Sequence, residues 1–386
     1  MFFNNLLVVA TVISLVSASP IEHHDTTRLV VVPMRRITNV SSVSGKDRLA
    51  ARRGLTTLES RASSGAIQNW DIQYVAPVEI GGKIWQLQVD TGSSNTWCGA
   101  RKPCEKSATG ISTGRKISMI YYKKKGEMHG IEYKDTVSFA GLTVKSQSIG
   151  AATSTKGIIM VDGVFGLGPV EQTEDTTSGI KRVPTFMNNL KAQGSIATEV
   201  FALSYRPESG NHMNDINGEL TIGGIDTSKY TGDLTYFPQV TTGPNAGCWG
   251  IAVTKFTYGS TTLISKVTAI VDSGTTFIYL PTAAYNAFLS ASGGQRCEQD
   301  LVCWTIKPTA NFSITFGSST YTLTPAQYLF PAAQYAPWNV PVGKYWSYIT
   351  EADHSKHSGI IGQKFLENYY SVFDAPNARI GFAANS

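Results

Sequence analysis

Val89-Asp90-Thr91-Gly92-Ser93-Ser94 is a short stretch that returns, slightly altered, as Val271-Asp272-Ser273-Gly274-Thr275-Thr276. In each copy an apolar run leads into an aspartate, a hydroxyl residue, a glycine and a second hydroxyl residue. The two aspartates lie 182 positions apart, close to half of the 386-residue chain. One copy alone is typical of an ordinary turn, because Asp and Gly are turn residues. Two copies in matching contexts indicate a duplicated half-molecule that brings two carboxylates together.

The composition around these copies predicts a β-rich globular chain that is long enough for two lobes. Apolar residues make up 42% of the sequence and charged residues 16%, and 36 glycines break it into short alternating runs. Helix signals are few, at 183–193, 282–291 and 325–330. The predicted strands are 70–78, 83–89, 116–122, 130–139, 142–149, 218–223, 234–238, 249–258, 265–271 and 312–323.

A second pair of stretches repeats between the halves. Two apolar residues precede Gly166, which follows Asp90 by 76 positions, and two precede Gly362, which follows Asp272 by 90. A glycine in this context is typical of a strand that passes close to another backbone.

The N-terminal 61 residues differ from the rest of the chain. Residues 1–18 have an apolar core and end Val16-Ser17-Ala18, which predicts a secretory signal peptide. Residues 19–61 carry eight Lys or Arg and four Asp or Glu, so most of the chain's net charge of +5 lies there. We interpret them as a basic propeptide, cleaved near Arg61, that covers an acidic cleft at neutral pH; the alternative is a disordered arm. The nearly neutral remainder argues against a nucleic-acid partner, and no later apolar run is long enough for a membrane anchor.

The five cysteines form two equally spaced pairs and one remainder. Cys98 and Cys104 are separated by five residues, as are Cys297 and Cys303, and neither pair lies in a zinc-binding pattern with histidines. In an oxidising compartment each pair can close a small disulfide loop. Cys248 is left over, and we expect it to act as a buried apolar side chain.

Two aspartates held face to face cannot both ionise at low cost, so they share one proton over a broad pH range. The ionised carboxylate can act as general base toward a water, and the protonated one can polarise a substrate carbonyl. Neither a metal nor a cofactor is needed. The remaining motif residues suit a supporting role: backbone amides at Gly92 and Gly274, hydroxyls that bond the opposite loop at Thr91 and Ser273, and hydroxyls that donate to the outer carboxylate oxygens at Ser93 and Thr275.

With its neighbours through Trp97, the first motif resembles one signature of the pepsin-like aspartic endopeptidases, and the second motif resembles the other. The closing stretch, 369–383, is similar to that family's C-terminal strands, and 219–226 is similar to the end of its first lobe. Within the family the chain looks nearest to fungal secreted members of the polyporopepsin type. The resemblance covers residues 70–386 and implies an all-β, bilobal fold with a cleft between two pseudo-symmetric lobes, 62–230 and 231–386. It also implies an acid-active endopeptidase that is made as a zymogen and acts on polypeptides.

One segment departs from the family pattern. The resemblance implies a hairpin flap with a substrate-binding tyrosine at Tyr121, with Tyr122 as the alternative. Lys123-Lys124-Lys125 replaces the usual flexible tip. This run is either an ordinary solvated turn or a cationic flap that disfavours Lys or Arg beside the scissile bond. Because of it, a non-catalytic aspartic-protease-like binding protein stays an alternative.

Other features carry less weight. Asn311 begins a glycosylation sequon, and the histidines near 354–357 lack further metal ligands at suitable spacing. A β-sandwich adhesin or lectin would leave the paired motifs unexplained. We expect a monomer that is secreted or delivered to a vacuole, with its own propeptide and polypeptide substrates as its partners.

Overall fold

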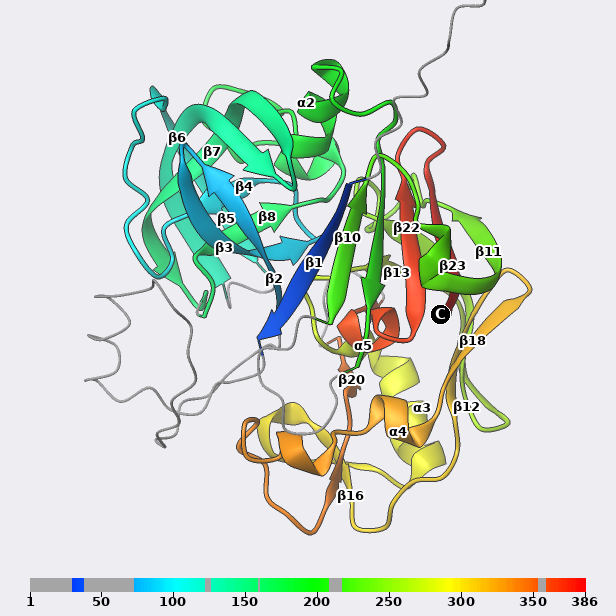
Figure 1. Ribbon diagram of the computed structural model, residues 1–386. Coiled ribbons are helices and arrows are strands. Elements are labelled where there is room, and N and C mark those ends of the chain that lie inside the picture. The colour runs from blue at the N-terminus through cyan, green and yellow to red at the C-terminus, as the bar shows by residue number, and fades with distance from the viewer. Residues whose placement is uncertain (1–29, 38–72, 122–125, 159, 208–216, 353–358) are drawn as a thin grey trace, which may run out of the picture.

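The chain forms two β-rich lobes joined by a shared sheet (Figure 1), in agreement with the all-β, bilobal fold expected from the sequence. This arrangement is taken from a computed structural model. For residues 30–37 only the backbone is described. The described residues are 30–37, 73–121, 126–158, 160–207, 217–352 and 359–386.

The largest sheet runs from the N-terminal lobe into the region between the lobes. Its spatial order is β11-β23-β22-β9-β10-β1-β2-β3-β8-β4-β7-β6-β5, and β2 also pairs with β6. The bounds of its strands are β1 (Val30–Ile37), β2 (Gln73–Ile80), β3 (Lys83–Asp90), β4 (Thr96–Cys98), β5 (Ile111–Tyr121), β6 (Gly126–Phe139), β7 (Leu142–Lys156), β8 (Gly163–Gly166), β9 (Val200–Tyr205), β10 (Gly218–Ile222), β11 (Tyr230–Pro238), β22 (Tyr369–Asp374) and β23 (Arg379–Asn385).

Two smaller sheets build the C-terminal lobe. The first has the order β18-β17-β12-β13-β21-β14-β20, and the second has the order β15-β16-β19. Their strands are β12 (Gly250–Tyr258), β13 (Thr261–Val271), β14 (Ile278–Leu280), β15 (Gln295–Arg296), β16 (Val302–Trp304), β17 (Phe312–Phe316), β18 (Ser319–Leu323), β19 (Tyr345–Trp346), β20 (Ile349–Glu351) and β21 (Ile360–Ile361).

Helices are short and lie at the margins of the sheets. The proline expected at the start of a helix occupies the first turn of α4, and a capping box closes that end. The α-helices are α2 (Phe186–Ala192), α3 (Thr282–Ser292), α4 (Pro325–Tyr328) and α5 (Gln363–Leu366), and the 3-10 helices are Val170–Thr173, Thr227–Lys229, Glu298–Asp300 and Ala332–Gln334.

The strands follow from alternating apolar side chains. In β6 buried and partly exposed residues alternate along most of the strand, so one face packs on the core. Aromatic rings then join the lobes at the shared sheet: Phe201 stacks on Phe373 with ring centroids 4.7 Å apart, and Trp249 meets Phe373 edge-on at 5.2 Å. Trp249 Nε1 also donates to Leu167 O at 2.9 Å. The lobes therefore share one continuous core.

The structure corrects some predicted bounds. The stretch predicted as one strand over 312–323 is a hairpin, β17 and β18, because Gly317 turns the chain at a positive φ of 55°. Residues 70–72 of the strand predicted over 70–78 lie outside the described residues, and at its other end the strand continues to Ile80. Strand β1 was not predicted from the sequence. It lies in the segment that was interpreted as the propeptide.

Candidate active site

Each of the two aspartates lies at the end of a central strand. Asp90 is the last residue of β3, which runs parallel to β8 with Asp90 opposite Gly166. Asp272 directly follows β13, which runs parallel to β21. Backbone bonds fix both ends: Leu167 N donates to Asp90 O at 2.8 Å, and Asp272 N donates to Ile361 O at 3.0 Å. The two loops therefore leave equivalent positions in their lobes.

The repeated glycines allow this close packing. A Cβ at Gly166 would fall on the backbone of Ser94, and one at Gly362 would fall on the carbonyl oxygens of Phe277 and Thr275. Both positions thus have the close backbone approach expected from the sequence.

Within each loop the carboxylate is held by its own neighbours. Gly92 N donates to Asp90 Oδ1 at 2.8 Å, and Ser93 Oγ donates to Asp90 Oδ2. In the other loop Gly274 N donates to Asp272 Oδ1 at 2.8 Å, and Thr275 Oγ1 donates to Asp272 Oδ2 at 2.6 Å. In both loops a glycine amide therefore donates to Oδ1 of the aspartate and a hydroxyl group donates to Oδ2.

The two loops also form hydrogen bonds with one another across the lobe boundary. Thr91 N donates to Ser273 Oγ at 3.0 Å, and Ser273 N donates to Thr91 Oγ1 at 2.9 Å. Each hydroxyl then donates onward at 2.9 Å, Thr91 to Val271 O and Ser273 to Val89 O. All of these groups are buried, so the four bonds fix the position of one loop relative to the other.

The two carboxyl groups meet at this boundary. Asp90 and Asp272 are 6% and 8% exposed, and their carboxyl groups lie close together: a Cβ built on Gly274 would be 2.3 Å from Asp90 Oδ1 and 3.2 Å from Asp272 Oδ1. A Cβ at Gly92 would fall inside the Asp272 carboxyl group, and one at Gly274 inside that of Asp90. Only glycine leaves room for two carboxylates here.

The electrostatics favour a bound proton. Burial, followed by the negative charge of Asp272, raises the pKa of Asp90 to about 8, while the donors Ser93 and Gly92 oppose the shift. Two buried carboxylates repel one another, and keeping one proton between them removes this repulsion. The arrangement can thus present a carboxylic acid and a carboxylate side by side over a wide pH range.

Three glutamines support the loops and were missed from the sequence. Gln88 Nε2 donates to Gly274 O at 2.7 Å, Gln172 Nε2 to Gly92 O at 2.9 Å, and Gln363 Nε2 to Ser273 O at 2.8 Å. Gln88 interrupts the apolar run before Asp90, and Gln363 follows the apolar run that ends at Gly362. A polar residue in such an apolar context is the signal that could have identified both. Gln172 has no comparable sequence signal.

Tyr121, the predicted flap tyrosine, is the last residue of β5. Tyr121 is fully described, and its hydroxyl accepts a hydrogen bond from Trp97 Nε1 at 2.6 Å. Burial, followed by the charge of Asp90, raises the pKa of Tyr121, so the hydroxyl stays protonated. The alternative Tyr122 and the lysines at 123–125 lie outside the described residues.

The remaining candidates lie away from this centre. The structure contains both disulfides, Cys98–Cys104 and Cys297–Cys303, with Cα atoms 5.5 and 6.0 Å apart. Asn311 is exposed, and the histidines at 354 and 357 lie outside the described residues. Within the part of the chain that is described, no three His, Cys, Asp or Glu side chains gather in a way that could hold a metal ion.

The leftover cysteine differs from its expected role. Cys248 is half-buried and accepts a hydrogen bond from Gln172 Nε2 at 3.2 Å. Burial raises the pKa of its thiol, so the unreactive character expected from the sequence is supported. The expected role as a buried apolar side chain is not supported, because the sulfur is only half-buried and has a polar partner.

Comparisons with known proteins place these features in context. A family model described as eukaryotic aspartyl protease matches residues 73–385. Polyporopepsin from Irpex lacteus is 37% identical over 340 residues, covering 84% of this chain and 98% of that protein. Rhizopuspepsin from Rhizopus chinensis is 31% identical over 327 residues, covering 79% and 76%. The crystal structure of the Irpex lacteus aspartic proteinase matches with a TM-score of 0.76 and 35% identity, over 81% of this chain and 94% of that one.

Proposed function

The chain belongs to the eukaryotic aspartyl protease family, and from this premise we propose that it is an endopeptidase that hydrolyses internal peptide bonds at acid pH. The observation that carries the proposal is the close approach of the Asp90 and Asp272 carboxyl groups inside a buried, symmetric set of donors. The altered flap motivated a non-catalytic alternative, but both aspartates and both glycines of the motifs are present, and nothing described favours that alternative.

The mechanism follows from one proton shared by two carboxyl groups. The ionised carboxylate takes a proton from a water, whose oxygen forms a bond to the scissile carbonyl carbon. The protonated carboxyl group donates to the carbonyl oxygen, so the intermediate carries two hydroxyl groups on that carbon. The carboxyl group that took the water's proton passes it to the amide nitrogen, and one hydroxyl of the intermediate returns its proton to the other carboxylate. The C–N bond breaks, a carboxylic acid and an amine leave, and the pair again holds one proton. No side chain of the enzyme becomes covalently attached to the substrate.

The supporting residues keep this geometry ready. Thr91 and Ser273 hold the loops in register, while Ser93 and Thr275 stabilise the ionised forms through the outer oxygens. Tyr121 is proposed to lie over the bound peptide as the flap residue. Because the groups are fixed before substrate arrives, little reorganisation is needed during the reaction.

Cleavage of a denatured protein at acid pH, followed by mass spectrometry, tests the proposal. We expect internal cleavage that a hydroxyl-bearing mimic of the transition state blocks. Asp90→Asn should abolish cleavage while the fold is retained. Asp233→Asn, at an exposed aspartate of β11, is the matched control and should keep full activity. Retained turnover in Asp90→Asn would refute the assignment.

We further propose that residues 1–18 are a signal peptide, that 19–61 form an inhibitory propeptide, and that 62–230 and 231–386 are the lobes of the mature enzyme. The support for a zymogen is β1, whose backbone pairs with β10 at Val30–Ile222 and with β2 at Arg35–Val75. Removal of the segment would therefore take a strand out of the shared sheet. The net charge of +4 on residues 19–61 also suits an acidic cleft that loses its negative charge on acidification.

Acid incubation of the purified precursor tests maturation. We expect a new N-terminus near Arg61, and we expect activity to increase as the precursor disappears. Full activity of the uncleaved chain would contradict the zymogen proposal without affecting the endopeptidase assignment.

We also propose secretion, or delivery to a vacuole, and glycosylation at Asn311, which is exposed just before β17. None of the helices among the described residues has the length and apolar character needed to cross a membrane. Treatment of the secreted protein with an endoglycosidase should lower its mass, and Asn311→Gln should remove that change.

A further inference from the structure

Two neighbouring residues of the C-terminal lobe, Cys248 and Trp249, lie against residues 167–172 of the N-terminal lobe. Trp249 Nε1 donates to Leu167 O at 2.9 Å, and Gln172 Nε2 donates to Cys248 Sγ at 3.2 Å. The two lobes therefore meet at a second place, besides the hydrogen bonds between the motif loops.

The same N-terminal segment is fastened to the first motif loop. Leu167 N donates to Asp90 O and Gly168 N donates to Ser93 O, each at 2.8 Å. Gly168 also leaves room for a side chain, because a Cβ at this position would fall on Gln172 Oε1. The segment thus carries the glutamine directly behind the loop of Asp90.

Both N–H groups of the Gln172 amide are used within the protein. Nε2 donates to Gly92 O at 2.9 Å and to Cys248 Sγ at 3.2 Å, and Oε1 accepts from Ser94 Oγ at 3.1 Å. A primary amide has two N–H donors and no more. Because a carbonyl oxygen can only accept, the bond to Gly92 fixes which way round the amide lies. The side chain has no donor left for a substrate.

The Gly92 carbonyl lies between the two groups that hold the Asp90 carboxylate. Gly92 N donates to Asp90 Oδ1 at 2.8 Å, and Ser93 Oγ donates to Asp90 Oδ2. The carbonyl belongs to the peptide that joins these two donors. A glycine backbone has more rotational freedom than any other, so a hydrogen bond on this carbonyl limits the movement of both donors. Gln172 can therefore influence Asp90 without touching it.

The other motif glycine is held in a parallel way. Gly274 O accepts from Gln88 Nε2 at 2.7 Å, and this glutamine belongs to the opposite lobe. Gly92 O is bound by Gln172 of its own lobe, and the same amide reaches Cys248 of the opposite lobe. Each glycine carbonyl is thus linked through a glutamine to the lobe that does not contain it.

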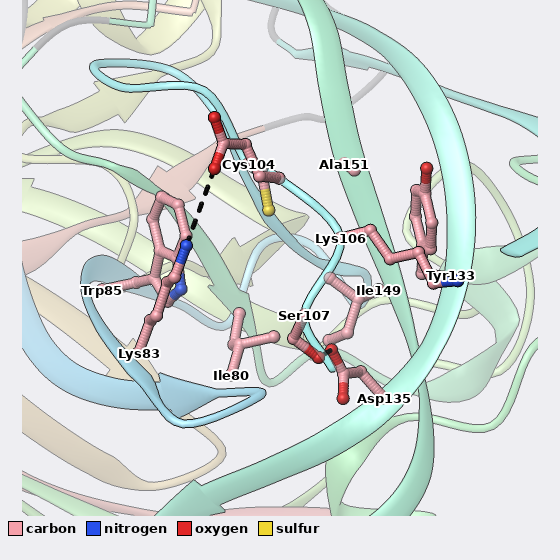
Figure 2. A pocket seen from close by; sticks show the side chains of 11 residues that line it. Ile80, Lys83, Trp85, Cys104, Lys106, Ser107, Tyr133, Asp135, Ile149 and Ala151 are labelled. Atoms are coloured by element: carbon pink, nitrogen blue, oxygen red, sulfur yellow. Dashed lines mark hydrogen bonds and ion pairs between the residues drawn. The ribbon is translucent and has the colours of Figure 1, made fainter. Parts of the chain in front are cut away.

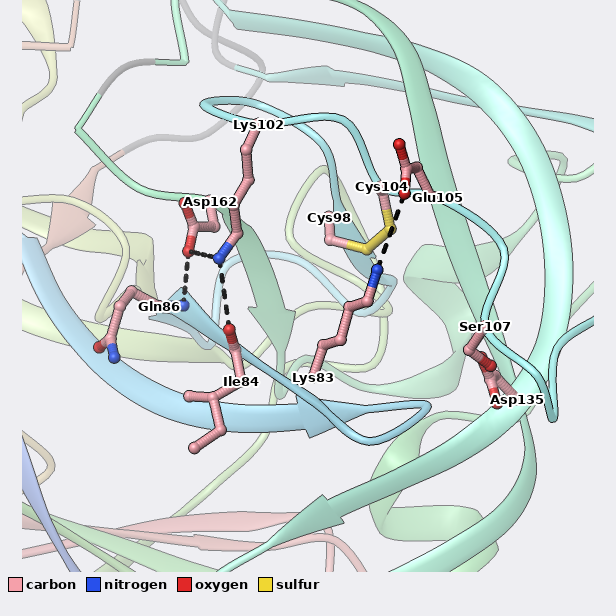
Figure 3. The surroundings of a disulfide bond; sticks show 10 residues. All are labelled: Lys83, Ile84, Gln86, Cys98, Lys102, Cys104, Glu105, Ser107, Asp135 and Asp162. Atoms are coloured by element: carbon pink, nitrogen blue, oxygen red, sulfur yellow. Dashed lines mark hydrogen bonds and ion pairs between the residues drawn. A yellow bond between two sulfur atoms is a disulfide. The ribbon is translucent and has the colours of Figure 1, made fainter. Parts of the chain in front are cut away.

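Polar contacts around the first disulfide loop illustrate the difference. Asp135 accepts from Ser107 Oγ at 2.6 Å in a hollow that both residues line (Figure 2). Asp162 pairs with Lys102 at 3.4 Å nearby (Figure 3). These contacts hold the disulfide loop on the strands beside it and involve no motif residue. The amide of Gln172, in contrast, ends on a glycine of the motif.

We propose that Gln172 is a positioning residue for Asp90 in peptide hydrolysis, and that Cys248 acts through it by holding the same amide from the opposite lobe. The inference rests on the proposed endopeptidase activity. Gln172 fixes the Gly92 carbonyl, and the donors on either side of that carbonyl keep the Asp90 carboxylate in its direction. Because the amide has no donor left for a substrate, its loss should lower kcat and leave KM nearly unchanged.

Peptide-cleavage kinetics of Gln172→Met and Gln172→Glu test the proposal. Methionine has a similar length but no amide, so kcat should fall at least about tenfold, with KM changed less than about twofold. A glutamic acid can donate to Gly92 O only while it is protonated. Gln172→Glu should therefore work nearly as well as the parent chain at about pH 3 and fall to the level of Gln172→Met, or below it, by about pH 6. The ratio of the two variants is the quantity to measure, because all native titrating groups are common to both.

Gln193 provides the matched control. It lies exposed at the end of α2, where its amide exchanges hydrogen bonds with the backbone of Lys145 at 2.9 and 3.0 Å. Gln193→Met and Gln193→Glu should leave kcat unchanged. If Gln172→Met keeps the kcat of the parent chain per folded molecule, or if the ratio of the two Gln172 variants does not change with pH, the proposal is wrong.

Variants of Cys248 test the sulfur without altering Gln172. Cys248→Ala removes the acceptor and should lower kcat about threefold or more, whereas Cys248→Ser keeps an acceptor and should stay within about twofold of the parent chain. Combining Gln172→Met with Cys248→Ala should give no further loss beyond Gln172→Met alone. Losses that multiply would mean that Cys248 does not act through the glutamine.

The result also separates this inference from the endopeptidase assignment. A parent chain that cleaves no peptide would refute the assignment, and this inference with it. An active parent chain whose Gln172 and Cys248 variants are equally active would refute this inference alone.

Discussion

The shared proton makes stability depend on pH in a defined direction. Burial and the neighbouring Asp272 raise the pKa of Asp90 from 3.8 to about 8. Between about pH 4 and pH 8 the folded chain therefore keeps a proton that the unfolded chain has released. The free energy of unfolding should fall as the pH rises through this window, because proton release favours the unfolded state.

The size of the effect follows from the shift. One pKa unit corresponds to about 1.4 kcal/mol, so the pair contributes a slope of up to about 1.4 kcal/mol per pH unit and on the order of 6 kcal/mol over the full window. This sum is an upper limit, since the two carboxyl groups titrate as a unit and other groups contribute slopes of their own. The difference between variants is therefore the quantity to measure.

Urea unfolding at intervals between pH 4 and pH 8 provides that difference. The parent chain should lose stability with rising pH, and Asp90→Asn should lose much less, because an amide holds no titrating proton. Asp233→Asn should follow the parent chain. If the parent chain and Asp90→Asn change in parallel across the window, the claim that a proton is held at this pair is wrong.

Three further substitutions test the packing around the site. Ser273→Ala removes a hydroxyl that bonds the opposite loop twice, and it should lower the free energy of unfolding by about 2–4 kcal/mol because buried backbone groups lose their partners. Tyr121→Phe leaves Trp97 Nε1 without its acceptor and should lower kcat/KM in a peptide-cleavage assay, with a stability loss of only about 1–2 kcal/mol. Glu367→Gln leaves the buried ammonium of Lys364 without its carboxylate at 3.0 Å and should cost about 3 kcal/mol in urea unfolding, with activity per folded molecule retained.

Each of these predictions has a result that would contradict it. A Ser273→Ala chain as stable as the parent would mean that the loops are held elsewhere. Unchanged kinetics in Tyr121→Phe would remove the tyrosine from the flap. Full stability in Glu367→Gln would mean that other partners hold the Lys364 charge, such as the Tyr348 ring, whose centre lies 4.1 Å from its ammonium.

The sequence predicted local features better than long-range contacts. The motif loops, the close approach at Gly166 and Gly362, and the cysteine pairs all depend on residues near one another in the chain or on an internal repeat. The bounds of β5 and β7 were less accurate, because each strand extends into polar residues that only pairing with β6 makes regular.

Contacts between distant segments that lie outside the repeated motifs could not be predicted from the sequence. Gln88 reaches Gly274 across 186 positions, and Trp249 reaches Leu167 across 82. The pairing of β1 with β10 joins segments that no periodicity connects. These contacts depend on how the lobes pack together, so they follow from the assembled fold rather than from local preference.

The most direct test of the central claim is a double-variant cycle on the two aspartates. Cleavage rates would be measured at acid pH for Asp90→Asn, Asp272→Asn and the double variant, each shown to be folded. If the two carboxyl groups act as one unit, each single variant should lose at least about a thousandfold in kcat/KM, and the double variant should lose no more than either single variant. Losses that multiply in the double variant, or turnover retained in either single variant, would contradict a shared catalytic proton.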